Sequence, residues 1–464
     1  MKRIFTSETV GKVGENVTVA GWIHARRDMG KVAFFDLRDK DGLLQIVVVP
    51  SAIGNDSMET ISAIRSEWVV QIEGVVQARS EKQINERIAT GTVEILAKNI
   101  IVLNEAKTPP FEIDKDTADI NEESRLKYRY LDLRTERLQH NIRLRSELVR
   151  HFRDFLYTKK FIEIETPYLT KATPEGSRDF VVPSRLQPGK FFALPQSPQQ
   201  YKQLLMTAGM ERYFQIARCF RDEDPRADRG FEHTQLDIEM SFVEREDVMN
   251  LIEEMMITVA EDLGYTIKEK PFPHITYNDA MKKYGADKFD LRSEEDKKAS
   301  VLAYAWVVDF PFFEKNDEGG WTFTHNPFSN PLPEFKEDLL AARNIENILT
   351  SQYDLVCNGY ECGGGSIRAH EPEILRSTYK IMGYSDEEIE DSVGHMLTAF
   401  KYGAPPHGGI GMGIERALMN LTGETSLRET QAFPMTGKGI TAVMDAPSEL
   451  PAKALKEANI KLDL

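Results

Sequence analysis

Cysteine is scarce in this chain of 464 residues, where only Cys219, Cys357 and Cys362 are present. Three thiols cannot build a disulfide framework, and no Cys-x-x-Cys motif or pair of spaced histidines supplies a zinc site. The sequence therefore gives no support for a redox motif or a structural metal.

Long apolar runs are also missing. The longest extends from Val301 to Val308, far short of the roughly 20 residues with which a helix crosses a bilayer. The first residues, Met1 to Thr6, lack the apolar core of a signal peptide. We therefore expect a globular protein of two or three domains, with no membrane partner and a cytoplasmic location.

Positive charge is in deficit, since 58 Lys and Arg face 74 Asp and Glu, for a formal net charge of −16. This balance argues against non-specific coating of nucleic acid, because phosphate contacts need clustered lysine and arginine. Residues 1–40 reverse the sign, with eight basic and five acidic side chains. Specific RNA binding by the N-terminal part therefore stays open, and no DNA partner is expected.

Residues 17–103 are rich in strand-like runs. These runs occupy residues 17–23, 34–37, 43–49, 68–76 and 93–103, with a hairpin signal at Asp41-Gly42 and a helix-like stretch near residues 57–66. Their order predicts an OB-type barrel, whose exposed face commonly binds single-stranded nucleic acid. A barrel with no ligand is an equally good interpretation of the pattern alone.

The remaining chain predicts a second, larger domain. Residues 104–124 are polar, contain Pro109-Pro110 and lack periodicity, which indicates a linker. Beyond them, helical and strand-like patterns alternate without a regular βαβ rhythm. This favours an antiparallel sheet flanked by helices, the α+β class.

Two segments of this larger part carry candidate chemistry for a phosphate ligand. Strand-like residues 213–220 and 234–241 flank a charged loop that begins at Arg221, and a guanidinium at a strand end suits a phosphate. From Gly408 to Met419, glycines let the backbone approach a ligand before an apolar helix that carries Arg416. A hairpin with surface ion pairs and a tight strand-to-helix turn are the simpler interpretations, and the occurrence of both segments in one chain weighs against them.

The glycine run at residues 363–365 does not belong to a P-loop. It leads into Ser366, Ile367 and Arg368, and no Gly-x-x-x-x-Gly-Lys-Ser/Thr motif is present in the sequence. Most glycine runs form turns, so this one alone is weak evidence for a nucleotide site.

Together with an extended segment that ends at Pro167, the two phosphate candidates resemble the three signature motifs of the class II aminoacyl-tRNA synthetases. Residues 128–134, 173–179, 194–203 and 358–368 are similar to the bacterial-type aspartyl-tRNA synthetases, and the resemblance covers nearly the whole chain. It implies an aspartate–tRNA ligase, which activates L-aspartate with ATP and transfers it to the 3′ end of tRNA(Asp), with tRNA(Asn) left open as a second substrate. The implied domains are an OB-fold anticodon-binding domain (1–104), a hinge (105–130) and a class II catalytic domain (131–464).

The resemblance also implies roles for single residues around ATP. The implied ATP-binding set is Arg221, Glu223, His233, Glu361 and Arg416. Arg221 would hold the α-phosphate and Arg416 the γ-phosphate, which makes these two, with Glu223, the implied catalytic residues. Asp354 and Glu361 would bind Mg²⁺ between the phosphates, through the oxygen ligands that a hard cation prefers.

A pocket for aspartate has to place cations on a carboxylate. The implied aspartate-binding set is Glu175, Ser197, Gln199, Lys202, Asp237, His325 and Arg368. Lys202 and Arg368 would hold the side-chain carboxylate of the substrate, and Asp237 would accept its ammonium group. Taken alone, Lys202 would be interpreted as a solvated helix residue.

In the barrel, the positions that match anticodon readers are Arg27, Phe34, Gln45 and Glu94. An aromatic ring beside donors and an acceptor is suited to single-stranded RNA. Met29 stands where leucine accompanies restriction to tRNA(Asp) in the family and histidine accompanies relaxed specificity. Because methionine is apolar like leucine, it favours tRNA(Asp).

The chain departs from the family pattern at several places. His233 stands where a phenylalanine usually stacks on adenine, Asn326 replaces a second histidine, and Glu415 replaces an aspartate. The extra domain of the bacterial enzymes is reduced to a short connection near residues 290–305. The segment around Pro167 implies a homodimer.

Three other functions remain to be weighed. A catalytically silent tRNA-binding paralogue would lack a phosphate arginine or a metal carboxylate, and none is lost here. A synthetase for asparagine or lysine conflicts with the Lys202 and Arg368 pair. A synthetase-derived amino-acid ligase conflicts with the intact N-terminal barrel.

Overall fold

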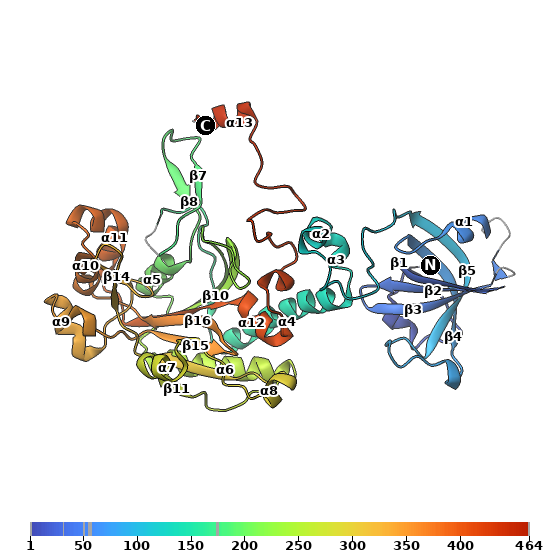
Figure 1. Cartoon of the computed structure of the whole chain (residues 1–464), viewed down its shortest axis with the longest axis horizontal. Helices are drawn as coiled ribbons and strands as arrows, with labels where there is room; N and C mark the ends of the chain where they lie inside the picture. The colour runs from blue at the N-terminus through green and yellow to red at the C-terminus, as the bar shows by residue number, and fades with distance from the viewer. Residues whose placement is uncertain (1, 31, 50–51, 54–57, 173–175, 463–464) are drawn as a thin grey trace. The chain divides into compact units, whose positions relative to one another are not determined.

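The computed structural model describes residues 2–30, 32–49, 52–53, 58–172 and 176–462 (Figure 1). The chain divides into two units, and each is described here by itself. Unit 1 consists of Met1–Asn121 and Tyr130–Glu136, and unit 2 consists of Glu122–Arg129 and Arg137–Leu464.

Unit 1 is built on a closed barrel with the strand order β1-β2-β3-β5-β4. Its strands are β1 (Asn16–Met29), β2 (Val32–Asp39), β3 (Gly42–Val48), β4 (Val69–Ala78) and β5 (Val93–Asn104), with helix α1 (Met58–Ala63) between β3 and β4. Alternate side chains such as Phe35, Leu37 and Ile46 are fully buried inside the barrel, as the period of two of a strand requires. The predicted OB-type barrel is therefore confirmed, including the hairpin between β2 and β3.

Residues 130–136 belong to unit 1 although they follow a segment of unit 2. Glu67 is buried and accepts hydrogen bonds from Arg38 at 2.7 Å and from Arg134 at 2.6 Å. The Arg134 guanidinium also lies 5.2 Å from the ring centroid of Trp22. A buried carboxylate needs such partners, so Glu67 ties this late segment to the barrel.

Unit 2 is built on an eight-stranded sheet with the order β11-β12-β15-β16-β17-β10-β9-β6. In chain order its strands are β6 (Ile162–Glu163), β9 (Arg212–Phe220), β10 (Glu232–Ser241), β11 (His274–Thr276), β12 (Tyr304–Val308), β15 (Tyr353–Cys357), β16 (Tyr360–Ile367) and β17 (His407–Gly413). The six inner strands are antiparallel, and only the edge strands β11 and β6 pair in parallel. The predicted α+β architecture is confirmed.

Three helices share a hydrophobic core with one face of this sheet. They are α4 (Glu136–Thr158), α6 (Arg245–Asp262) and α12 (Ile414–Thr422), whose apolar side chains cluster with Leu236 and Ile238 of β10 and with Ile410 and Met412 of β17. The intervening residues of β10, Asp237 among them, must therefore point to the other face.

The other elements of unit 2 lie around the sheet (Figure 1). The helices are α2 (Glu122–Lys127), α5 (Gln199–Thr207), α7 (Tyr277–Tyr284), α8 (Glu294–Lys298), α9 (Lys336–Leu340), α10 (Pro372–Ile381), α11 (Asp386–Phe400) and α13 (Ala452–Glu457), and α3 (Arg129–Asp132) spans a boundary between the units. Two hairpins complete the unit, β7 (Val181–Pro183) with β8 (Phe191–Ala193) and β13 (Phe313–Lys315) with β14 (Trp321–Phe323).

Gly364 of β16 and Gly409 and Gly411 of β17 lie inside strands and line the open face of the sheet. Asp237, Gly411, Gly364 and Asp354 stand opposite one another on four successive strands. Neighbours in such a row point to the same face, so two glycines separate the two carboxylates. The interpretation of residues 363–365 as a turn is wrong, because the backbone there is paired on both sides.

Gly409 is a place where this face tolerates no side chain. A Cβ at Gly409 would overlap the carbonyl oxygen of Ile238 and the carboxylate of Glu239, whereas a Cβ at Gly413 on the same strand would meet nothing within 4 Å. We expect Gly409→Ala to lower the free energy of unfolding of unit 2 by ~3 kcal/mol or more, at or above the upper end of the usual cost of overpacking. Gly413→Ala should cost about 1 kcal/mol or less, as at a helix N-cap. Calorimetric unfolding of both full-length variants provides the measurement, and equal shifts would contradict this account of the glycine strands.

Candidate functional site

Four charged side chains form a buried cluster on the open face of the sheet. Lys202 of α5 donates to Asp237 and lies 3.2 Å from Glu239. Arg368, just after β16, donates to Glu239 from Nε at 2.9 Å and from NH2 at 3.1 Å. All four are at most 2% exposed. The structure therefore brings together the predicted Lys202, Asp237 and Arg368.

Glu239 is the member of the cluster that sequence reasoning missed. It lies two residues after Asp237 on β10, so the period of a strand places both carboxylates on one face; that spacing was the available signal. Burial acts to raise the pKa of Glu239, but Arg368 and Lys202 outweigh it and hold that pKa below its ordinary value. Burial dominates at Asp237 and raises its pKa despite Lys202.

The cluster is held by neutral polar groups at its edge. Gln235 donates from Nε2 to Asp237 at 2.7 Å, and Arg368 NH1 donates to Ser366 at 3.0 Å. A Cβ at Gly411 would overlap the Gln235 amide, which explains why glycine stands there. Gln235 was also missed by sequence reasoning, although it shares the period-two spacing with Asp237.

Ser197 and Gln199 lie at the start of α5, next to the cluster. The backbone N–H of Gln199 donates to Ser197 Oγ at 3.3 Å, and Gln199 Nε2 donates to Gln203 Oε1 at 2.9 Å. Gln203 in turn contacts the buried ring of His407 at 3.2 Å. The bond to Gln203 therefore fixes the orientation of the Gln199 amide. The predicted Glu175 lies outside the described residues.

The two predicted phosphate arginines lie on different elements and are only lightly engaged. Arg221 Nε donates to the carbonyl oxygen of Gln196 at 3.4 Å. Arg416, on α12, donates to the carbonyl oxygen of Glu361 at 3.1 Å and to Asp228 at 3.2 Å. The two arginines can exchange these partners for phosphate oxygens without leaving a buried charge unpaired.

Glu223 lies in the loop that follows Arg221. It accepts hydrogen bonds from Ser177 and, at 3.2 Å, from Arg229. Burial acts to raise its pKa, but the Ser177 bond together with Arg221 and Arg229 lowers that pKa overall. Glu223 is therefore ionised at neutral pH and positions the loop.

His233 lies near both phosphate arginines. Burial, aided by Arg221, lowers the pKa of His233 to about 4. The ring is therefore neutral at pH 7. Glu415 accepts the backbone N–H of Thr234 at 3.0 Å and a bond from Arg145 at 2.9 Å, so the departure from aspartate at 415 keeps a carboxylate that anchors this strand.

Asp354 and Glu361 have opposite electrostatic surroundings. Burial and the charge of Glu361 raise the pKa of Asp354 to about 7. Glu361 is held at a pKa of about 2 because Lys288, at 2.8 Å, and Arg416 outweigh its burial. Glu361 thus has ion-pair partners within the protein, whereas Asp354 forms no ion pair among the described residues.

His325 lies with Asp354 rather than with the four-charge cluster among the described residues. Asp287, His325 and Asp354 each offer a ligand atom, and these atoms all lie within 4.8 Å of one another. Sequence reasoning gave no support for a histidine metal site, because the three positions are far apart in the chain and match no spacing motif.

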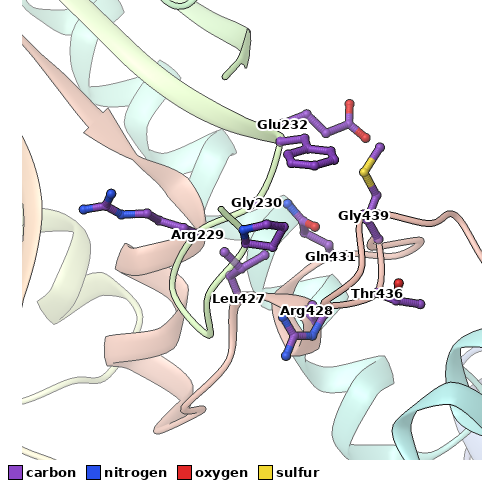
Figure 2. A pocket seen from close by; sticks show the side chains of 11 residues that line it. Arg229, Gly230, Glu232, Leu427, Arg428, Gln431, Thr436 and Gly439 are labelled. Carbon is purple, nitrogen blue, oxygen red and sulfur yellow. The ribbon is translucent and has the colours of Figure 1, made fainter. Parts of the chain in front are cut away.

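A small cavity lies behind the loop that follows β9. It measures about 20 Å³, and its walls include Gly230, Leu427, Gln431 and Gly439 (Figure 2). That volume holds about one water molecule and is far too small for a nucleotide. In Figure 2 the side chain of Arg229 extends away from the other labelled residues, and its guanidinium donates to Glu223 at 3.2 Å.

The four predicted anticodon residues share the outer face of the barrel in unit 1. Arg27 donates to Gln45 at 3.3 Å, Gln45 donates to Glu94 at 2.8 Å, and Phe34 stands opposite Arg27 in the strand register. Met29, at the end of β1, is 70% exposed. The arrangement offers one ring beside donors and acceptors.

Two further charged residues join this face and were missed. Asp36 accepts a bond from Arg27 at 2.8 Å. Arg79 lies 3.6 Å from Glu94, and its buried Nε and NH2 have no hydrogen-bond partner within the described part of the chain. The alternation of β2 gives a signal for Asp36, but nothing local in the sequence marks Arg79.

The chain matches two family models. Residues 121–437 match the model of the class II tRNA synthetases (D, K and N), and residues 17–103 match that of the OB-fold nucleic acid binding domain. No helix among the described residues has the length and apolarity of a membrane span.

Curated relatives match over almost their whole length. The aspartate–tRNA ligase of Geobacillus kaustophilus is 38% identical over 577 aligned positions, which take in 97% of each chain. The aspartate–tRNA(Asp/Asn) ligase of Dehalococcoides mccartyi is 38% identical over 589 positions, with 98% of each chain covered. Both alignments are longer than this chain of 464 residues. The relatives therefore carry segments inside the match that this chain lacks, in agreement with the expected loss of a bacterial domain.

Solved structures share the fold. The asparaginyl-tRNA synthetase of Pyrococcus horikoshii, in complex with asparaginyl-adenylate, superposes with a TM-score of 0.75 at 22% identity and covers 94% of this chain and 98% of its own. The aspartyl-tRNA synthetase of Entamoeba histolytica gives a TM-score of 0.74 at 23% identity, with 94% and 91% covered.

The four-charge cluster predicts a large difference between two glutamates of β10. Glu239→Gln leaves Lys202 and Arg368 with a single carboxylate and should cost ~3–5 kcal/mol of unfolding free energy, as for a broken buried ion pair. Glu232→Gln removes a half-exposed partner of Arg218 and should cost at most about 1 kcal/mol. Thermal or urea unfolding of both variants checks this. A similar loss in both would mean that the buried cluster does not support the sheet.

Proposed function

The chain belongs to the bacterial-type aspartyl-tRNA synthetases of class II, and we propose that it activates L-aspartate with ATP and transfers the aspartyl group to tRNA(Asp). The buried cluster of Lys202, Arg368, Asp237 and Glu239 is the single observation that carries the choice of aspartate. A synthetase of this class for asparagine has no use for two buried cations at the side-chain end of its pocket.

A count of charges explains the choice. In the substrate-free protein, two cations face two carboxylates. Bound aspartate adds its ammonium group beside Asp237 and its side-chain carboxylate beside Lys202 and Arg368, which gives three charges of each sign. The α-carboxylate, which both amino acids carry, faces the α-phosphate and is outside this count. Asparagine therefore brings the ammonium group to the cluster without a side-chain charge and leaves one buried positive charge without a partner. Such an excess costs several kcal/mol, and ~3 kcal/mol is already more than a hundredfold in binding.

ATP is held by groups that neutralise its phosphates. Arg221 binds the α-phosphate and Arg416 the γ-phosphate, each after it releases the weak partners that it has in the substrate-free protein. The neutral ring of His233 stacks on adenine. No covalent nucleophile is needed, because the α-carboxylate of aspartate attacks the α-phosphorus directly once both substrates are aligned.

Asp354 and Glu361 fit a magnesium ion. Both provide carboxylate oxygens, which Mg²⁺ prefers, and Asp354 is buried and forms no ion pair among the described residues. When bound, Mg²⁺ neutralises charge on the phosphates of ATP. The chain's own contribution is to hold Glu361 ionised through Lys288 and Arg416.

The register of the sheet sets the distance between the two ends of the site. Asp237 and Asp354 are separated by three strand intervals, or ~14 Å at about 4.8 Å each. The glycines between them add no side chains to the floor, although the Gln235 amide lies over Gly411 and the Asp354 carboxylate over Gly364. This is room for an amino acid joined to the phosphate end of a nucleotide.

The barrel reads the anticodon. Its outer face offers the Phe34 ring for stacking, with Arg27, Gln45 and Glu94 as donors and acceptors in one connected chain. Residues near Pro167 provide the surface for a homodimer, since Tyr168, Leu169 and Ile162 are each more than 40% exposed.

Exchange of pyrophosphate into ATP tests the amino-acid choice. The wild-type protein should exchange with aspartate and hardly at all with asparagine. Arg368→Leu leaves two cations against three carboxylates when aspartate binds, so we expect aspartate-dependent exchange to fall by about a hundredfold or more, the equivalent of ~3 kcal/mol. The ratio of aspartate-dependent to asparagine-dependent exchange should fall by a similar factor.

Arg343→Leu is the matched control, because Arg343 pairs with Asp338 at the surface. It should exchange like the wild type. Absence of aspartate-dependent exchange in the wild-type protein would overturn the proposed function, whereas normal exchange in Arg368→Leu would overturn only the pocket.

Charging of two purified transcripts tests the tRNA choice. Met29 is exposed and cannot hydrogen-bond a base, so we expect kcat/KM for tRNA(Asp) to exceed that for tRNA(Asn) by roughly 5- to 150-fold, the value of one base contact. Met29→His should lower the ratio of kcat/KM for tRNA(Asp) to kcat/KM for tRNA(Asn). Equal values in the wild type would instead indicate an enzyme that charges both tRNAs, as the printed name of the Dehalococcoides relative states for that protein.

A further inference from the structure

Three side chains near the phosphate end converge, and none of them forms an ion pair within the described residues. Asp287 follows α7, His325 follows β14, and Asp354 lies on β15. Within the described residues, no hydrogen bond or ion pair engages the Asp287 carboxylate or either ring nitrogen of His325. Asp354 accepts one bond there, from Gln352 to Oδ1 at 2.7 Å. Its second oxygen is left without a donor although the residue is only 2% exposed.

We propose that Asp287, His325 and Asp354 form a divalent-cation site that fills without nucleotide and without Glu361. Two carboxylates on two elements and an imidazole on a third provide the charge and the lone pairs that such an ion needs. Asp354 is a buried residue with one hydrogen bond and no ion pair within the described residues; a carboxylate with so little compensation is costly in a folded protein, and a cation at this point removes that cost.

The geometry is close to that of a bound ion. The three ligand atoms lie within 4.8 Å of one another, while ligands on opposite sides of an ion are roughly 4.2 Å apart at bond lengths of about 2.1 Å. Small side-chain rotations are enough to bring the three ligand atoms to bonding distance from one ion. The ring of Phe310 meets His325 edge-on at 4.5 Å between centroids, which restrains the imidazole on one side.

Glu361 is not one of these three ligands, and in the substrate-free protein its charge is paired within the chain. It lies 2.8 Å from Lys288 and 3.7 Å from Arg416. The proposed site shares only Asp354 with the magnesium pair of the proposed function, and its existence does not depend on that function. Carboxylates suit both Mg²⁺ and Mn²⁺, whereas imidazole suits first-row transition metals, so this mixed set of ligands should prefer Mn²⁺ to Mg²⁺.

Manganese binding to the chelator-treated, full-length protein tests the site, with no ATP, aspartate or tRNA present. The loss of the free Mn²⁺ signal in electron paramagnetic resonance should show one bound ion per chain, displaced only by a large excess of Mg²⁺. His325→Ala and Asp287→Asn should each weaken binding at least about tenfold. The matched control is Asp290→Asn, since Asp290 lies in the same loop and is paired with Arg292.

Glu361→Gln separates the new site from the nucleotide magnesium pair. It should keep its bound Mn²⁺. The proposal is overturned if the wild-type protein binds no Mn²⁺, or if binding is lost in Glu361→Gln and kept in His325→Ala. Thermal midpoints of the variants confirm that each is folded, and His325→Asn provides a second, polar replacement. Because no substrate is present, failure here is distinct from failure of aspartate activation.

Discussion

Lys202 and Arg368 lie with Asp237 and Glu239 in the interior of the catalytic unit, and each depends on the others to be there. A single buried charge would be expelled or neutralised, but four in contact satisfy one another. The sheet makes room for them with glycines on the adjacent strands, since a side chain at Gly409 would displace Glu239. The absence of side chains at these glycines therefore leaves the space that the buried charges occupy.

The charged side chains at the phosphate end of the site are also paired, but not all of them. Arg416 and Glu361 already have ion-pair partners in the substrate-free protein, so substrate binding exchanges one set of partners for another. Asp354 is the exception, because it is buried and forms no ion pair among the described residues. In the substrate-free protein, every charged side chain of the four-charge cluster at the amino-acid end therefore has an ion-pair partner. At the nucleotide end, Asp354 has none among the described residues.

The period of strands and the turn chemistry were enough to predict the barrel, its hairpin at Asp41-Gly42 and the paired strands β9 and β10. Single residues were harder. Glu239 and Gln235 share their alternation with Asp237 and could have been found, whereas the meeting of Asp287, His325 and Asp354 depends on how the sheet and two loops fold together. The glycine run was misjudged because glycine favours turns locally, and only its pairing between β15 and β17 shows that it serves as a floor.

The bond between Arg134 and Glu67 has a consequence for how such a protein can be divided. Because residues 130–136 return to unit 1 after a segment of unit 2, the chain crosses the boundary three times. A fragment that ended with the last barrel strand would retain Glu67 but lose one of its two arginines. Recombination between related genes at the apparent linker would break this pair unless both sides kept it. The barrel unit therefore does not end at its last strand, because residues 130–136 belong to it as well, and exchange of the barrel between relatives has to include them.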